Sequence, residues 1–130
     1  MRRLFTAVFA SLAFAGVAHS ADPEIVSLIR LIAAPHEYDG KRIVVIGVPR
    51  IDFESYGLYL HKEDFDQGLT KNALWIVVPN DKDAEWKALE GQYVLVDGIF
   101  SAQNTGHMGM YSGAISKITR FRAVQRRNVK

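Results

Sequence analysis

The chain has 130 residues, of which 48% are hydrophobic and 23% are charged, with a formal net charge of +2 at pH 7. It contains no cysteine, which excludes disulfide-stapled scaffolds, zinc sites built on thiolates and thiol nucleophiles. A chain of this length and hydrophobic content is typical of a single domain with an ordinary apolar core.

The first 20 residues have the pattern of a secretory signal peptide. Arg2 and Arg3 precede an apolar run over residues 4–18, and residues 18–20 (AHS) form a small-x-small cleavage pattern. The apolar run is too short for a comfortable membrane span, although an uncleaved N-terminal anchor is the alternative. We therefore predict a cleaved signal peptide at 1–20, a mature chain without a transmembrane span and a periplasmic or secreted location.

Charge is distributed unevenly along the predicted mature chain. Residues 21–116 include 14 acidic and 8 basic residues, a formal net charge of −6, whereas residues 117–130 include six basic and no acidic residues. An acidic body is a poor surface for nucleic acids, because their binding depends largely on neutralising phosphates. We therefore expect no nucleic-acid partner. Residues 122–130 are predicted to be a basic, disordered tail, which permits weak contact with anionic surfaces or simply aids solubility.

The mature chain begins with a predicted helix that ends by Ala34, because Pro35 cannot continue it. Two starts remain open: Asp22 as the N-cap with a proline in the first turn, or Ser27 as the N-cap of a shorter helix. Apolar residues at helical spacing are expected to share one buried face. These residues are Ile25, Leu28, Ile29 and Ile32.

The next predicted element is a strand over residues 42–48, which follows a turn at 36–40. Its apolar residues do not alternate with polar ones, so we expect both of its faces to be covered. Gly47 inside this run predicts a bulge or a sharp bend, and Pro49 predicts a position at an edge or a corner. Residues 51–54 could continue the strand beyond the bend.

A hairpin turn is predicted at residues 55–57, and it leads into a second strand at 58–61. Period-two alternation assigns the side chains of this strand to two faces. Leu58 and Leu60 are predicted to point inward, and Tyr59 and His61 outward. The polar connection 62–72 contains one predicted helical turn at 63–66, and a third strand covers 73–78.

A second helix is predicted from Asn80 or Asp81 to residue 90, where Gly91 ends it. Trp86 and Leu89 are expected on its buried side. Two further strands and their connecting loop complete the domain. They are a strand at 92–100, a loop at 101–109 and a strand at 110–121.

The predicted order of helix, three strands, helix and two strands is that of an OB-fold. The first strand of that fold is long and strongly bent, which suits a strand with Gly47 at its middle. In the last strand, Ile115 and Ile118 break strict alternation and indicate a bulge. An SH3-like barrel and an irregular α+β domain are the competing folds. We predict that residues 21–121 form a mainly β domain, a five-stranded OB-like barrel with an N-terminal helix and a helix between strands three and four.

One segment also resembles a known group of domains. Residues 35–47 have the sequence PHEYDGKRIVVIG. This segment resembles the P-x-x-Y-x-G-K-x-V-x-V-x-G pattern at the start of small bacterial exported OB-fold-like domains, including the tRNA-anticodon-binding-like group. The resemblance implies an OB-fold and a binding role. Because OB domains bind oligonucleotides, oligosaccharides, peptides and proteins, it does not select a ligand.

In an OB-fold, the loops after the first and fourth strands flank the ligand groove. Here these loops are residues 49–57 and 101–109. We predict that ligand-binding side chains gather between them, because aromatic rings with scattered polar groups suit peptides, proteins and sugars. The predicted ligand-binding residues are Tyr56, Tyr59, His61, His107 and Tyr111. Trp75 could line the same face, but barrel packing is an alternative role for Trp75 and Tyr111.

The loop also suggests a soft-metal site. His107, Met108 and Met110 combine an imidazole with two thioethers, a ligand set that suits Cu(I), and His61 could add a second nitrogen. The alternative is that the two methionines fill irregular gaps at the end of the barrel.

No catalytic pattern is evident in the sequence. There is no nucleophile-elbow or phosphate-loop motif, and the acidic run at 63–68 lacks the spacing of a calcium loop. We therefore predict an exported, non-catalytic module without a cofactor, which binds an envelope protein, a peptide or a glycan. The alternative is a copper-binding protein centred on His107, Met108 and Met110.

Overall fold

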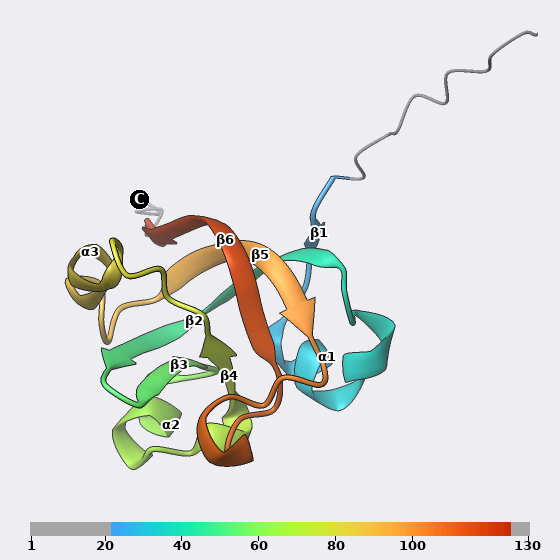
Figure 1. Cartoon of the computed structure of the whole chain (residues 1–130), viewed down its shortest axis with the longest axis horizontal. Helices are drawn as coiled ribbons and strands as arrows, with labels where there is room; N and C mark the ends of the chain where they lie inside the picture. The colour runs from blue at the N-terminus through green and yellow to red at the C-terminus, as the bar shows by residue number, and fades with distance from the viewer. Residues whose placement is uncertain (1–21, 126–130) are drawn as a thin grey trace, which may run out of the picture.

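The computed structural model describes residues 22–125, so the predicted signal peptide and residues 126–130 of the predicted tail lie outside the described residues. The described chain is mainly β, with a six-stranded mixed sheet and three short α-helices (Figure 1). The strands are β1 (Glu24–Ile25), β2 (Arg42–Asp52), β3 (Ser55–Tyr59), β4 (Ala73–Ile76), β5 (Val94–Ser101) and β6 (Ala114–Ala123). The helices are α1 (Leu28–Ala33), α2 (Lys62–Gln67) and α3 (Asp83–Lys87), with 3-10 turns at Pro35–Glu37, Thr70–Asn72 and His107–Gly109.

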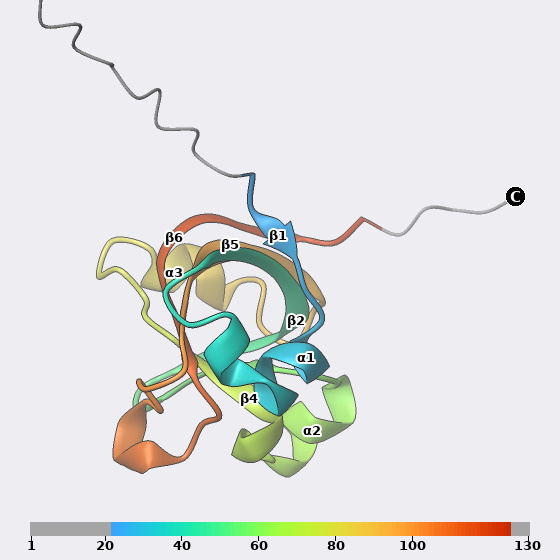
Figure 2. The same ribbon diagram turned by 90° about the vertical axis from the view of Figure 1, so that its right-hand side faces the viewer.

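Strand β2 organises the sheet, because each of its halves pairs with a different neighbour. The first half, from Arg42 to Gly47, is antiparallel to β5, and the second half, from Val48 to Asp52, is antiparallel to β3. The partner changes at Gly47, where a Cβ would lie 2.7 Å from the backbone oxygen of Tyr59. Figure 2 shows the curvature of β2 beside β5. The bend predicted at Gly47 is therefore confirmed.

The other pairings return the sheet to β2. Strand β3 is antiparallel to β4, β4 is parallel to β6, and β6 is antiparallel to β5. The pairing thus passes from β2 through β3, β4, β6 and β5 and back to β2. Strand β1 was not predicted and pairs in parallel with β2 at Ile43 and Val44. The observed sheet therefore has one strand more than the five predicted.

Helix α1 starts as in the shorter of the two predicted versions. The hydroxyl of Ser27 accepts a hydrogen bond from a backbone N–H of the first turn, so Ser27 is the N-cap. The predicted buried face is only partly right, because Leu28 is buried but Ile29 is 58% exposed. Ile25 belongs to β1, and Leu31 takes the second buried position.

The first hairpin turn was predicted at 55–57, but it lies at residues 53–54. Glu54 has a φ of 58°, in the left-handed region, which suits a turn of two residues. Gly57 suggested the turn, yet it lies within β3, where a Cβ would come within 2.9 Å of the Tyr111 ring. This glycine makes room for a packed aromatic ring and does not form the turn.

The second half of the chain follows the predicted order with shifted boundaries. Helix α3 is shorter at both ends than predicted, and Trp86 is buried as expected. Strand β6 begins later than predicted and includes Arg122 and Ala123, so the strand extends into the predicted tail. The register between β5 and β6 shifts between Asp97 and Ile99, which confirms the predicted bulge.

Buried side chains form two apolar clusters. The larger cluster joins residues of β2 to β6 with residues of α1 and α3, and Ile43, Leu58 and Phe100 are among its fully buried members. The smaller cluster holds Val48, Tyr59, Ala73 and Tyr111, with Phe65 and Trp75 packed at its edge. The second cluster supports the candidate functional site described below.

Asp97 is the one charged residue that is buried among residues 22–125. One carboxylate oxygen lies 2.9 Å from Nη2 of Arg42, and the other accepts a hydrogen bond of 2.9 Å from Nε of Arg120. The carboxylate thereby joins β2, β5 and β6. Within the same residues, none of the helices has the length and hydropathy that crossing a bilayer requires.

Candidate functional site

A groove of about 420 Å³ lies between the turn after β2 and the loop that joins β5 to β6. In Figure 1 this loop, drawn in orange to red, lies beside β4. We call this groove the aromatic groove. It is lined by Phe53, Glu54, Tyr56, Trp75, Asn104, Gly106 and His107. The predicted flanking segments 49–57 and 101–109 therefore do face each other across a hollow.

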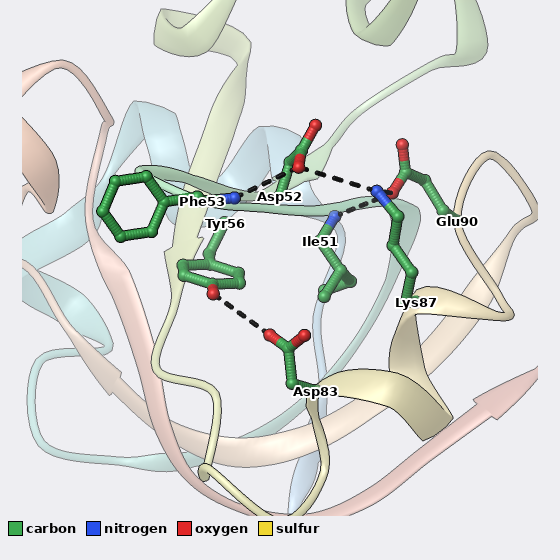
Figure 3. A network of polar contacts seen from close by, with 7 residues as sticks. All are labelled: Ile51, Asp52, Phe53, Tyr56, Asp83, Lys87 and Glu90. Carbon is green, nitrogen blue, oxygen red and sulfur yellow. Dashed lines mark hydrogen bonds and ion pairs between the residues drawn. The ribbon is translucent and has the colours of Figure 1, made fainter.

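Phe53 is the most exposed aromatic side chain of the aromatic groove, with 83% of its surface accessible. The two-residue turn holds it outward, and its backbone N–H donates to a carboxylate oxygen of Asp52 at 3.2 Å (Figure 3). A large apolar ring gains nothing for folding when it stands in water, and this ring lies beside a hollow, so it is a candidate contact for a ligand. The sequence pattern predicts the turn two residues too late, and Phe53 is therefore absent from the predicted site residues.

Trp75 on β4 forms the floor of the groove. Its ring meets the rings of Tyr56 and Tyr111 edge-on, with centroids 5.7 Å and 5.3 Å away. Gly106 presses against it: a Cβ at that position would lie 2.6 Å from Cγ of Trp75. The φ of Gly106 is 68°, and its N–H donates to the side chain of Asn104 at 3.0 Å. Only glycine lets the loop pack so closely against the indole.

Two of the predicted ligand-binding tyrosines lie beneath the surface. Tyr59 is 1% exposed and Tyr111 is 2% exposed, both in the smaller apolar cluster. The prediction that Tyr59 points outward is wrong, because α2 and Phe65 cover that side of β3. Burial also raises the pKa of Tyr59 to about 12. Both tyrosines can support the groove floor, but they do not line the groove.

Tyr56 connects the groove to three nearby carboxylates, those of Asp52, Asp83 and Glu90, which are called here the acidic rim. Its hydroxyl donates to a carboxylate oxygen of Asp83 at 3.0 Å, and this hydrogen bond raises the pKa of Tyr56 above its ordinary value. Nearby, Nζ of Lys87 lies 2.7 Å from a carboxylate oxygen of Glu90 and 3.8 Å from one of Asp52 (Figure 3). The turn after β2 and helix α3 are thus held together by polar contacts.

The predicted histidines and methionines are only partly gathered. His107 lines the groove, and its Nε2 lies 3.9 Å from a carboxylate oxygen of Glu54. Met108 is 83% exposed with a φ of 52°, and Met110 is 42% exposed. His61 is exposed at the start of α2 and is not among the groove-lining residues.

Conventional metal ligands do not converge in the described part of the chain. Among residues 22–125, no group of three or more histidine, aspartate or glutamate side chains could hold a metal ion. A metal site here would therefore depend on the thioethers of Met108 and Met110, together with His107.

Two other hollows have different chemistry. One of about 450 Å³ lies between α3 and β6, where Lys82 pairs with Glu85 at 2.8 Å and Arg120 pairs with Asp97. The other, of about 520 Å³, is called here the Ile46 hollow. It is lined by Ile46, Lys62, Gly91, Gln92, Tyr93 and Val124. The aromatic groove is distinguished by its position between the two predicted loops and by Phe53, which is 83% exposed, whereas Tyr93 of the Ile46 hollow is 46% exposed.

No protein family model, curated protein or solved structure matches the chain. Function is therefore inferred from the chemistry of the aromatic groove. The groove offers exposed apolar area, hydrogen-bonding groups and negative charge in one hollow. Such a combination suits binding, since apolar rings supply contact area and polar groups at the rim supply orientation.

Proposed function

We propose that the chain is an exported, non-catalytic binding module that recognises a protein, peptide or glycan of the cell envelope through the aromatic groove. The observation that carries this proposal is Phe53, whose ring is 83% exposed beside Tyr56 and Trp75. Support for export comes from the signal-peptide pattern of residues 1–20. A periplasmic or secreted location follows from that pattern.

We also propose that strands β2 to β6 form an OB-like barrel. Support comes from the bent strand β2 shared by two neighbours, from the parallel pair of β4 and β6, and from the position of α3 between β4 and β5. In this interpretation the turn after β2 and the loop between β5 and β6 are the loops that flank the ligand groove of an OB-fold.

Among the three ligand classes, a peptide or protein segment fits best. A sugar ring usually stacks flat on an open indole face, but Gly106 packs against the ring of Trp75 and two tyrosine edges surround it. The side chains of a peptide do not need an open indole face, because they can insert between aromatic rings. Phe53 and Tyr56 provide such a position. A glycan therefore ranks below a peptide for this groove.

Capture from an envelope extract tests the proposal. The bait is the mature chain, compared with Phe53→Ser and with Ile29→Ser, which removes an exposed apolar side chain on α1 away from the groove. We expect Phe53→Ser to lose a captured partner that the wild type and Ile29→Ser retain. Equal recovery of every partner by Phe53→Ser would reject the groove.

The alternative function, Cu(I) binding, is favoured by one observation. Met108 and Met110 are 83% and 42% exposed, so they do not fill gaps in the core. Thioethers beside the imidazole of His107 remain available to a soft ion. Calorimetric titration with Cu(I) should then give binding that the double variant Met108→Ala/Met110→Ala loses. Binding that is absent, or unchanged in the double variant, would end this alternative.

A further inference from the structure

We propose that the aromatic groove selects a cation, the guanidinium or ammonium group of an arginine or lysine side chain in a basic peptide segment. This inference rests on the proposed binding function and names the chemistry of its ligand. The inference depends on two features that occur together at the groove. These features are aromatic rings and carboxylates that have few positively charged partners.

The lining of the groove is negative. Its lining residues include one carboxylate, Glu54, and no lysine or arginine. The basic group nearest to this carboxylate is the imidazole of His107, whose Nε2 lies 3.9 Å away. Since Glu54 is more than half exposed, its charge is available to a ligand.

The acidic rim, of which Asp52 and Asp83 contact groove residues without lining the groove themselves, adds further negative charge. Asp83 holds the hydroxyl of Tyr56, and Asp52 accepts the backbone N–H of Phe53. Lys87 forms ion pairs with this rim, and its Nζ lies nearer to a carboxylate oxygen of Glu90, at 2.7 Å, than to one of Asp52, at 3.8 Å. Figure 3 shows the carboxylates around the turn after β2 and the start of α3. The rim therefore carries more negative than positive charge.

The rings of Phe53 and Tyr56 present the second half of a cation site. A guanidinium or ammonium group is attracted to an aromatic face within about 6 Å of its centroid. The chain uses the same contact internally, where the guanidinium of Arg50 lies 4.4 Å from the centroid of Phe65. A cation in the groove would therefore meet both π faces and the carboxylate of Glu54.

The pKa shifts of two side chains are consistent with this excess of negative charge. The hydrogen bond to Asp83 raises the pKa of Tyr56, and the nearby charges of Asp83 and Asp52 raise it further. The pKa of Lys87 is raised, chiefly by its hydrogen bond to Glu90.

Calorimetric titration with matched peptides tests the inference. The probes are the amidated and acetylated peptides Gly-Phe-Arg-Phe-Gly, Gly-Phe-Gln-Phe-Gly and Gly-Phe-Glu-Phe-Gly. We expect the arginine peptide to bind about three- to ten-fold more tightly than the glutamine peptide, and the glutamate peptide to bind most weakly. Glu54→Gln should remove most of this preference. Glu63→Gln on α2, which removes one charge outside the groove, should retain it.

The outcomes separate this inference from the proposed function. Equal binding of the arginine and glutamine peptides, with both lost in Phe53→Ser, would overturn cation selection and leave groove binding intact. A preference that persists in Glu54→Gln would overturn the role of that carboxylate and so the assigned site. Absence of binding by all three peptides would contradict both the inference and the proposed function.

Discussion

At the scale of single residues, Asp97 is the charge on which the sheet most depends. Its buried carboxylate joins Arg42 of β2 and Arg120 of β6, and the side chain is 5% exposed. A hydrogen bond to a charged group contributes more to stability than one between neutral groups. Removing the partner of a buried charge is costly, because the remaining charge is neither paired nor solvated by water. The sequence analysis did not single out Asp97, since an aspartate before a glycine in a strand resembles any turn residue.

We expect Asp97→Asn to lower the free energy of unfolding by about 1–3 kcal/mol, because the amide cannot balance two guanidinium groups. Urea denaturation followed by circular dichroism measures the change. The matched control is Asp66→Asn, which breaks an exposed pair with Lys62 on α2 and should cost less than about 0.5 kcal/mol. Equal effects of the two substitutions would contradict the importance of the Asp97 contacts.

Tyr56 gives a second test at this scale. Because the hydrogen bond to Asp83 raises the pKa of Tyr56, Asp83→Asn should lower that pKa toward its ordinary value of 10.0. The measurement is the ultraviolet phenolate titration, compared in each background with and without Tyr56→Phe. An unchanged difference titration in Asp83→Asn would show that this hydrogen bond does not form in solution.

Tyr59 gives a third test at this scale, through the dependence of stability on alkaline pH. Burial raises the pKa of Tyr59 to about 12, so the folded chain holds a proton that the unfolded chain loses near pH 10. The stability contributed by this group is complete below about pH 10 and is lost as the pH rises toward 12. Urea midpoints should therefore fall across that range and fall less in Tyr59→Phe. An equal fall in the variant would contradict the assignment.

At the scale of elements, β2 explains how two halves of the sheet are connected. Gly47 lies at the change of partner from β5 to β3, where any side chain would strike the Tyr59 backbone and the side chain of Leu58. The bend could be predicted from the sequence, because a glycine inside an apolar strand often marks a bulge or a tight bend. It could not predict which strands the two halves meet, since that depends on contacts distant in sequence.

Gly47→Ala should lower the free energy of unfolding by about 1–3 kcal/mol, because the added Cβ would lie 2.7 Å from backbone that pairs with β2. Thermal or urea denaturation measures the loss. The neighbouring substitution Ile46→Thr is the control, because Ile46 is 45% exposed and the change should stay within about 0.5 kcal/mol. An alanine variant as stable as the wild type would contradict the close approach at this position.

The turn after β2 shows where sequence reasoning failed at this scale. Gly57 and its neighbours suggested a turn, whereas the turn uses Glu54, a residue that rarely adopts positive φ. The shift by two residues changed which side chain stands at the rim of the groove, from Tyr56 alone to Phe53 with Tyr56. A phenylalanine between two acidic residues was the only signal for Phe53 in the sequence, and it is a weak one.

At the scale of the whole molecule, the order of helices and strands could be predicted because apolar runs, prolines and glycines mark their ends. Strand β1 could not, since two residues with an exposed Ile25 leave no periodic pattern. The loops 49–57 and 101–109 were predicted to flank a ligand groove, and residues of both segments line one hollow. The burial of Tyr59 could not be foreseen, because it depends on α2 and Phe65, whereas packing was already the alternative role given to Tyr111. The barrel itself remains a proposal.

The most direct test of the central claim is a nuclear magnetic resonance titration of the chain with the arginine peptide. If the aromatic groove is the binding site, backbone amide signals of Phe53, Glu54, Tyr56, Trp75 and His107 should shift and saturate together. The same titration of Phe53→Ser should give little change. Saturating shifts confined to the Ile46 hollow, or no saturable shifts at all, would contradict the proposed site.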